Sequence, residues 1–156
     1  MKKAIYPGSF DPITNGHIDI LKRALQVFDE VTILVADNQN KKSRFTVEER
    51  VSMIKDATEG LKGVKVDSTH GLTVEYAKRI GVKHLIRGLR AVTDYEYEFA
   101  LAAANHYIDS SIDMVFFMAS SDFSFISSSA IDEMYKGNID ISKLVPESVV
   151  KMYEKK

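Results

Sequence analysis

Residues 1–36 read MKKAIYPGSFDPITNGHIDILKRALQVFDEVTILVA, and this stretch decides the fold because a strand, a helix and a second strand follow one another in it. The apolar residues 3–6 predict a short strand that ends at the breaker pair Pro7-Gly8. Residues 31–36 form a continuous apolar run rich in β-branched side chains. Such a run is typical of a strand that is covered on both faces, as in parallel sheets.

The segment between these two strands divides into a polar loop and a helix. Residues 9–15 have no helical period. From Gly16 to about Asp29 the apolar residues recur on one helical face, at Ile18, Leu21, Leu25 and Phe28. The loop therefore leads directly into the N-terminus of a helix.

Strands and helices continue to alternate along the rest of the chain. Thr46 and Glu49 have the spacing of a capping box, and Gly81 has the place of a helix C-cap. The further predicted elements are a helix from Thr46, a weak strand at residues 64–67, a helix over Thr73–Ile80, a strand at 83–86, a long helix from about Asp94 to Ile108, a strand at 114–118, a helix over Ser128–Lys136 and a C-terminal helix with Pro146 at its first position (N1).

This alternation predicts an α/β protein with a doubly wound sheet of five parallel strands in a single domain. The sequence has no repeat, low-complexity stretch or linker that would divide residues 1–156. Ligands of such sheets bind outside the carboxyl ends of the strands. The loops after the first, second, fourth and fifth strands should therefore converge on one site.

The composition narrows the class of protein. A chain of 156 residues has the length of one domain, and 45% hydrophobic residues are enough for a core. Lys plus Arg number 21 and Asp plus Glu number 22, so the formal charge is −1 and no net field favours duplex nucleic acid or anionic lipid as a partner; we expect neither. The absence of cysteine excludes a disulfide scaffold, a thiolate metal site and a thiol nucleophile. No run reaches the ~18 apolar residues of a membrane helix, and we expect a cytoplasmic protein.

The loop after the first predicted strand is the first candidate site. It ends in Thr14-Asn15-Gly16-His17, which opens a helix, where free backbone N–H groups and the helix dipole favour phosphate. Gly16 allows close approach, and His17 can donate a hydrogen bond to a phosphoryl oxygen. The alternative interpretation is a turn with a helix-capping histidine.

Two cationic segments follow other strands at the same predicted edge. Residues 41–44, KKSR, come after the second strand, and residues 87–90, RGLR, end the fourth. Guanidinium groups bind phosphate through paired hydrogen bonds and stay charged, so two arginines suit a site for several phosphates. Alternatively, the lysine run is a solvated surface and the arginines form structural ion pairs with acidic residues that follow, namely Asp94, Glu96 or Glu98.

The fourth candidate is the serine-rich segment at residues 123–129, FSFISSS, placed after the fifth strand and before a helix. Its hydroxyl and backbone groups can donate to triphosphate oxygens, or they can simply cap that helix. The sequence contains no Walker A loop, Gly-x-Gly-x-x-Gly fingerprint or Gly-x-Ser-x-Gly elbow. His70, His84 and His106 lack a metal-ligand spacing, and we predict no protein metal centre.

Residues 14–17 resemble the (His/Thr)-x-Gly-His signature of the nucleotidylyltransferase superfamily. Residues 6–12, YPGSFDP, are most similar to the bacterial phosphopantetheine adenylyltransferases, and so are residues 45–50, 87–92 and 94–98. Residues 126–129 resemble the superfamily's Ile-Ser-Ser-(Ser/Thr) motif. The resemblance covers essentially the whole chain. One departure is that Asp132 and Glu133 stand where some members carry an arginine or lysine.

The resemblance implies a Rossmann-like enzyme that transfers the adenylyl group of ATP to 4′-phosphopantetheine, giving dephospho-coenzyme A and pyrophosphate. It implies Mg²⁺ as cofactor, held mostly by phosphate oxygens and water, and a homo-oligomer, typically a hexamer. The implied catalytic residues are His17, Lys41 and Arg90, and the implied acceptor contacts are Ser9, Lys41, Thr73 and Arg87. The implied ATP contacts are Ser9, Phe10, His17, Gly88, Leu89, Arg90, Glu98, Phe123, Ser124, Phe125, Ile126, Ser127, Ser128 and Ser129.

Other functions on this fold stay open at this point. Within the superfamily, the acceptor could be nicotinamide mononucleotide, or a cytidylyl group could be transferred to a small alcohol phosphate such as glycerol 3-phosphate. Threonine at position 14, where those families usually have histidine, and the RGLR segment count against both. A non-catalytic nucleotide-binding module is the alternative from another class, and the presence of His17, Lys41 and Arg87 counts against it.

Overall fold

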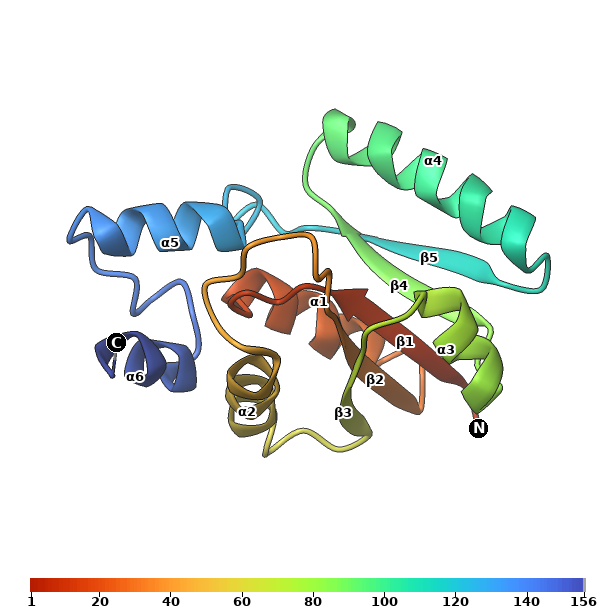
Figure 1. Cartoon of the computed structure of the whole chain (residues 1–156), viewed down its shortest axis with the longest axis horizontal. Helices are drawn as coiled ribbons and strands as arrows, with labels where there is room; N and C mark the ends of the chain where they lie inside the picture. Colours follow the sequence, from red (N-terminus) through yellow and green to blue (C-terminus); the bar gives the residue numbers. More distant parts are fainter. Residues whose placement is uncertain (156) are drawn as a thin grey trace.

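Five parallel strands form one sheet, in the order β3-β2-β1-β4-β5, in the computed structural model of the chain, which describes residues 1–155 apart from the side chains of Val92 and Thr93 (Figure 1). The strands are β1 (Lys3–Gly8), β2 (Glu30–Ala36), β3 (Val64–Thr69), β4 (His84–Leu89) and β5 (Asp113–Met118). From β1 the chain adds β2 and β3 on one side of the sheet and then β4 and β5 on the other. The point between β1 and β4 is therefore the topological switch point, where a binding site is expected. The predicted Rossmann-like α/β fold is confirmed.

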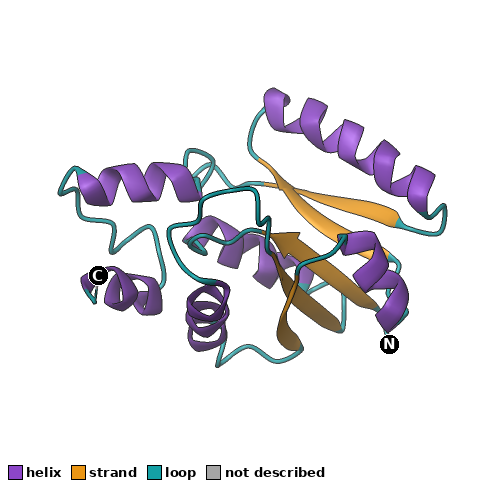
Figure 2. Cartoon of the chain, in the orientation of Figure 1, coloured by secondary structure: helices purple, strands orange, loops and turns teal. Residues whose placement is uncertain are grey.

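Six helices flank this sheet (Figure 2). They are α1 (Asn15–Ala24), α2 (Val47–Ala57), α3 (Thr73–Ile80), α4 (Val92–Ile108), α5 (Ser128–Lys136) and α6 (Glu147–Glu154). The capping box at the start of α2 is present, with Glu49 N donating to Thr46 Oγ1 over 3.1 Å. Gly81 ends α3 in the left-handed region at φ 71°, as predicted.

Several helix boundaries differ from the prediction, and α4 begins at Val92 rather than at about Asp94. α1 ends at Ala24 and not near Asp29, because residues 25–28 turn the chain so that the backbone N–H of Asp29 can donate to Lys2 O. Pro146 is the N-cap of α6 and not its first residue. Its ψ of 155° is extended, while its carbonyl accepts the first helical hydrogen bond, from Val149 N.

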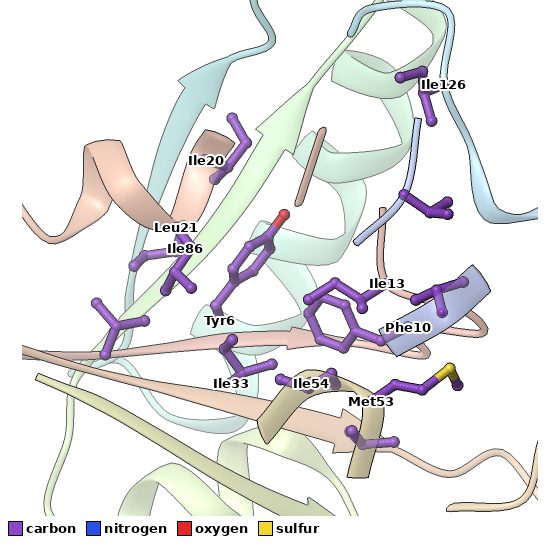
Figure 3. Packing of buried hydrophobic residues seen from close by; sticks show 14 of the residues in the cluster. Tyr6, Phe10, Ile13, Ile20, Leu21, Ile33, Met53, Ile54, Ile86 and Ile126 are labelled. Atoms are coloured by element: carbon purple, nitrogen blue, oxygen red, sulfur yellow. The ribbon is translucent and has the colours of Figure 1, made fainter. Parts of the chain in front are cut away.

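Both faces of the sheet are buried. Successive strand residues point into two different apolar clusters, one with Tyr6, Ile33 and Ile86 and one with Ile5, Leu34 and Leu85. Helices α1 and α2 pack on the first face, α5 and α6 add side chains to the same apolar cluster, and α3 contributes to the cluster on the second face. Figure 3 shows Tyr6 and Phe10 side by side among the isoleucines of the first cluster. Because both faces are buried, strands such as residues 31–36 have continuous apolar runs rather than alternating apolar and polar residues.

The central strands separate where the site is expected. β1 pairs with β2 along its whole length, but it pairs with β4 only through Ala4 and Ile5. Beyond Ile5, the carbonyl of Pro7 accepts a hydrogen bond from the side chain of Arg87 at 2.9 Å. The opening between β1 and β4 therefore places a guanidinium group at the switch point of the sheet.

Helix α4 stands at the β5 end of the sheet and packs on β4 and β5 (Figure 1). Much of its apolar surface is exposed, at Tyr95, Tyr97, Phe99, Tyr107 and Ile108. Within residues 1–155, none of the helices combines the length and the apolar character that a membrane span requires.

Candidate active site

A cavity of about 310 Å³ lies at the carboxyl ends of β1 and β4. Its lining comes from the loop after β1, the end of β4, the first half of α4 and the segment that precedes α5. Three of the four predicted loops thus meet in one hollow. The volume lies at the lower end of the range of small-molecule sites, which is roughly 300–1,000 Å³.

Thr14 and His17 fix the first wall of this cavity. Thr14 is the N-cap of α1, and its Oγ1 accepts a hydrogen bond from His17 N at 3.3 Å. In return, Nδ1 of His17 accepts one from Thr14 N at 2.9 Å. A backbone N–H can only donate, so the proton of the neutral ring must lie on Nε2. Histidine here takes the place that Glu or Gln has in an ordinary capping box.

The imidazole of His17 is neutral at physiological pH. Burial, together with the charges of Arg87 and Arg90, lowers its pKa to about 3. The ring packs edge-on against Phe10, with 4.9 Å between the ring centroids. The capping role and the phosphate-binding role are therefore compatible in His17. It caps the helix through Nδ1 and keeps Nε2–H as a donor for a ligand.

Ser9 and Phe10 lie in the loop that joins β1 to α1. Phe10 has a φ of 46°, in the left-handed region, and its ring is buried against Tyr6. Phe10 also lines the cavity. Ser9 lines the cavity, and its carbonyl accepts a hydrogen bond from Arg50 at 2.9 Å.

Arg87 supplies a second wall, and its main partner is a carboxylate. Its Nε lies 3.0 Å from both oxygens of Glu98, and its NH2 group lies 2.7 Å from Oε1. Burial alone would lower the pKa of Arg87, but the hydrogen bonds and charge of Glu98 raise it. With Pro7 O as a further acceptor, three of the five guanidinium N–H groups are engaged. The other N–H groups remain as donors for an anion.

Arg90 is held in a similar way at the rim. Its Nε donates to Asp94 Oδ2 at 3.2 Å, and its NH1 donates to the carbonyl of Ile126 at 3.1 Å. Both arginines thus form the structural ion pairs that the sequence left as an alternative, while both also line the cavity. Gly88 lines it between them, and Leu89 is buried beside it without lining it.

Hydroxyls of the serine-rich segment have hydrogen-bond partners within the fold. Ser127 Oγ caps α5 by accepting from Ala130 N at 3.1 Å, and Ser128 Oγ donates to Pro12 O at 2.7 Å. Phe123, Ile126, Ser127 and Ser128 line the cavity. The other three residues do not line it: Ser124 bonds to Ser121 O, Phe125 is exposed, and Ser129 lines a neighbouring hollow.

That neighbouring hollow has a volume of about 330 Å³, and Lys41 is one of the residues that line it. It shares Ser9 and Ser128 with the first cavity, so the two form one connected region. Lys41 is exposed on the loop between β2 and α2. Thr73, the first residue of α3, lines neither hollow.

Two further residues hold these loops together, and although both lie in segments that carry the resemblance, this role was not predicted for them. The guanidinium of Arg50 is buried and donates to Ser9 O, Phe45 O and Asp37 Oδ1. The carboxylate of Asp11 accepts from the backbone N–H groups of Arg44 and Phe45 at 2.7 and 2.9 Å. One signal was available for Arg50, since it shares the helical spacing of the apolar Val47 and Ile54.

The electrostatics of the region suit a ligand with several negative oxygens. Arg87, Arg90, Lys41 and the N-termini of α1 and α5 all face it, and the two carboxylates in the first cavity, Asp94 and Glu98, are already paired with arginines. Within the part of the chain that the structure describes, no group of three or more metal-ligating side chains is present. The site therefore offers hydrogen-bond donors and cations to an anion.

Comparison with known proteins identifies the family. A family model described as cytidylyltransferase-like matches residues 5–134. The phosphopantetheine adenylyltransferase of Lachnoclostridium phytofermentans is 48% identical over 156 residues, covering 99% of this chain and 96% of that protein. Those of Desulfitobacterium hafniense and Nautilia profundicola are 51% and 47% identical over 96% of this chain, and cover 91% and 97% of their own lengths. The chain belongs to the cytidylyltransferase-like family and, within it, to the phosphopantetheine adenylyltransferases.

Proposed function

We propose that this protein transfers the adenylyl group of ATP to the phosphate of 4′-phosphopantetheine, forming dephospho-coenzyme A and pyrophosphate in coenzyme A biosynthesis. The observation that carries the proposal is the Nε2–H donor of His17, which Thr14 holds in place at the start of α1 beside two arginines. Full-length similarity to curated phosphopantetheine adenylyltransferases supports the choice of acceptor.

The reaction needs no general base. The second pKa of a phosphate monoester is about 6, so the acceptor phosphate is largely a dianion at neutral pH. One of its oxygens attacks the α-phosphorus of ATP, the new P–O bond forms, and the bond to the bridging oxygen of the β-phosphate breaks. Pyrophosphate leaves with the bonding electrons. Asp94 and Glu98 are paired with arginines, which fits a site where carboxylates accept no proton.

His17 would act on the charge that develops in this step. Its Nε2–H would donate to a non-bridging oxygen of the α-phosphate, whose negative charge grows in the transition state. A neutral imidazole suits this role because it donates without releasing a proton. Lys41 and Arg90 would stabilise the phosphates from the two sides of the connected region, and positioning of the two substrates would supply much of the rate.

The remaining contacts are proposed residue by residue. Ser9, Lys41, Thr73 and Arg87 would hold the acceptor, with Thr73 at its pantetheine arm. ATP would lie along Ser9, Phe10, His17, Gly88, Leu89, Arg90 and Glu98 and along residues 123–129. An anion at Arg87 would share this guanidinium with Glu98, since the carboxylate uses one edge of it.

Mg²⁺ fits this site as a companion of ATP. The carboxylates of the first cavity are committed to arginines, so phosphate oxygens and water would supply most of the ligands of the ion. Bound there, it would offset the negative charge of the triphosphate.

We also propose that the protein is a cytoplasmic homo-oligomer, with six subunits as in the family it resembles. The exposed aromatic residues of α4 support an assembly. Tyr95, Phe99 and Tyr107 are all exposed on one helix, and so much exposed apolar surface on one element is typical of an interface rather than of single surface residues. A cytoplasmic location fits the use of ATP as a substrate.

Pyrophosphate release from ATP with three acceptors tests the proposed function. We expect release with 4′-phosphopantetheine and at least ~100-fold less with nicotinamide mononucleotide or glycerol 3-phosphate, because a site built for one acceptor leaves polar groups unpaired with another. Equal or greater release with either alternative acceptor would assign the enzyme to another branch of the superfamily. Binding of ATP without release in any reaction would indicate a binding module.

A further inference from the structure

Asp132 occupies the position after the serine-rich segment where some superfamily members carry a cation. It lies on α5, and its carboxylate is surrounded by one side chain of α5 itself, one of α6 and one of the loop between β2 and α2. Lys136 Nζ lies 2.9 Å from Oδ2, Tyr153 OH lies 3.1 Å from Oδ1, and Arg44 Nε lies 3.3 Å from Oδ1. Only 20% of the Asp132 side chain is exposed, so solvent screens these contacts less than it screens a surface pair. In this chain the acidic side chain therefore pairs with a cation from another element, Arg44, at that end of the site.

Arg44 belongs to the loop between β2 and α2, and it is tied to three parts of the fold. Its backbone N donates to Asp11 in the first loop at 2.7 Å, and its side chain pairs with Asp132 on α5. The guanidinium carbon also lies 5.2 Å from the ring centroid of Tyr153 on α6. The Nε atom is buried, and its contact with Asp132 is an ion pair without the geometry of a hydrogen bond. Arg44 is thus an anchor for its loop rather than a solvated cation.

Lys41 precedes Arg44 by three residues in the same loop. Lys41, Arg44, Ser128 and Asp132 all line the second hollow, of about 330 Å³. The Arg44–Asp132 pair joins the loop that carries Lys41 to α5 at this hollow.

We propose that Asp132 is a positioning residue, which holds Arg44 and thereby keeps the loop at residues 37–46 and its Lys41 beside the start of α5, where the acceptor phosphate binds. This inference rests on the proposed function for the identity of the acceptor. The ordering of the loop by the pair is independent of it. The competing explanation is that Asp132 only fastens α6 to α5, through its hydrogen bond from Tyr153, and that the loop is unaffected by its pair with Arg44.

Steady-state kinetics of Asp132→Asn and Arg44→Ala separate the two explanations. We expect the KM for 4′-phosphopantetheine to rise about tenfold in each variant, which is ~1.4 kcal/mol, with the KM for ATP within about twofold of wild type. The double variant should lose no more than about the larger single loss, because both changes break one contact. Asp132→Glu keeps the charge and should recover part of the affinity.

Glu147→Gln is the matched control. It removes an i,i+4 ion pair with Lys151 on α6, where both side chains are more than half exposed, and should change neither KM. An acceptor KM within twofold of wild type in both Asp132→Asn and Arg44→Ala would overturn the proposal. So would an equal rise in the KM for ATP, or losses that add in the double variant.

Amide hydrogen exchange gives a readout that does not depend on catalysis. In Asp132→Asn, the amides of residues 41–45 should exchange at least ~5-fold faster than in Glu147→Gln, because the loop opens locally. Unchanged exchange there, or acceleration confined to α6, would contradict the positioning role. If the wild type releases no pyrophosphate with 4′-phosphopantetheine, the proposed function fails, and the exchange result still decides whether the pair orders the loop.

Discussion

Nδ1 of His17 lies 2.9 Å from the backbone nitrogen of Thr14, and this contact determines which end of the imidazole faces the ligand. The donor role at Nε2 and the capping role at Nδ1 come from one side chain. Conservative variants of this residue can therefore separate catalysis from stability.

His17→Gln should fold like the wild type and lose turnover. Glutamine at the third helical position can accept from Thr14 N and so preserve the capping box, but its amide does not reproduce the Nε2–H donor. We expect kcat to fall ~10²–10³-fold and ATP affinity to change much less, since the contact strengthens in the transition state. His17→Ala should show the same kinetic loss and also lose about 1 kcal/mol of stability with the cap. Kinetics beside urea unfolding check both, and near-normal turnover in both variants would leave His17 only a structural role.

The low pKa of His17 makes a prediction about pH. Its pKa in the folded protein is about 3, below the ordinary 6.5, so the unfolded state binds this proton more readily between those values. The contribution of neutral His17 to stability is complete above about pH 6.5 and is lost as the pH falls toward 3. The free energy of unfolding should therefore fall more steeply below pH 6.5 in the wild type than in His17→Gln. Parallel curves would mean that His17 titrates normally.

The titration of His17 should not affect catalysis near neutral pH. Because His17 stays neutral, kcat with saturating substrates should show no histidine inflection between about pH 5.5 and 8. The KM for the acceptor should still vary near pH 6, where its phosphate titrates. Turnover that requires a protonated group with a pKa of 6–7 would indicate that an imidazolium is the working form.

Arg87→Ala should weaken the acceptor more than ATP. A charge-assisted hydrogen bond to phosphate is worth ~1.5–3 kcal/mol, or roughly 10–150-fold in affinity. This change also leaves the carboxylate of Glu98 buried without its partner, so the fold should lose stability as well. Arg87→Lys, which keeps a charge beside Glu98, controls for that loss and should still weaken the acceptor. Calorimetric titration of both ligands decides, and a collapse of ATP binding alone would assign Arg87 to the nucleotide.

A charge on the exposed face of α4 should disrupt assembly. Phe99 is 63% exposed in the single chain, and Phe99→Glu should shift sedimentation from the oligomer to smaller species. Ile139→Glu is the control, because Ile139 is 57% exposed in the turn after α5. A wild-type protein that sediments as a stable monomer at micromolar concentration would reject the assembly, and dissociation by Ile139→Glu alone would place the interface elsewhere.

Much of the fold follows from local sequence signals. The strand at residues 31–36 and the helices Thr73–Ile80 and Ser128–Lys136 have strong apolar periods or caps, and the structure has them within one residue of the predicted bounds. The predicted ends of β1 and β4 are too early, because Pro7-Gly8 is a breaker pair and the apolar residues of the fourth strand stop at Ile86. Pro7-Gly8 and Arg87-Gly88 continue their strands, since pairing with β2 and β5 outweighs the local preference.

The site was predictable in its outline and not in its connections. The rule that ligands bind at the carboxyl ends of parallel strands was enough to bring His17, Arg87, Arg90 and Ser128 together. The partner of Arg87 could not be chosen among three nearby carboxylates, since α4 had to be placed before Glu98 could be singled out. Arg50 was not predicted because its partners are mostly backbone carbonyls, which no sequence motif records.

The central claim is that an oxygen of the acceptor phosphate attacks the α-phosphorus of ATP. The most direct measurement uses 4′-phosphopantetheine labelled with ¹⁸O in its phosphate, with ³¹P NMR and mass spectrometry of the products. We predict dephospho-coenzyme A that retains all of the label, part of it in the new P–O–P bridge, and an equal amount of unlabelled pyrophosphate. Label in the pyrophosphate, or pyrophosphate formed without the labelled product, would contradict the account.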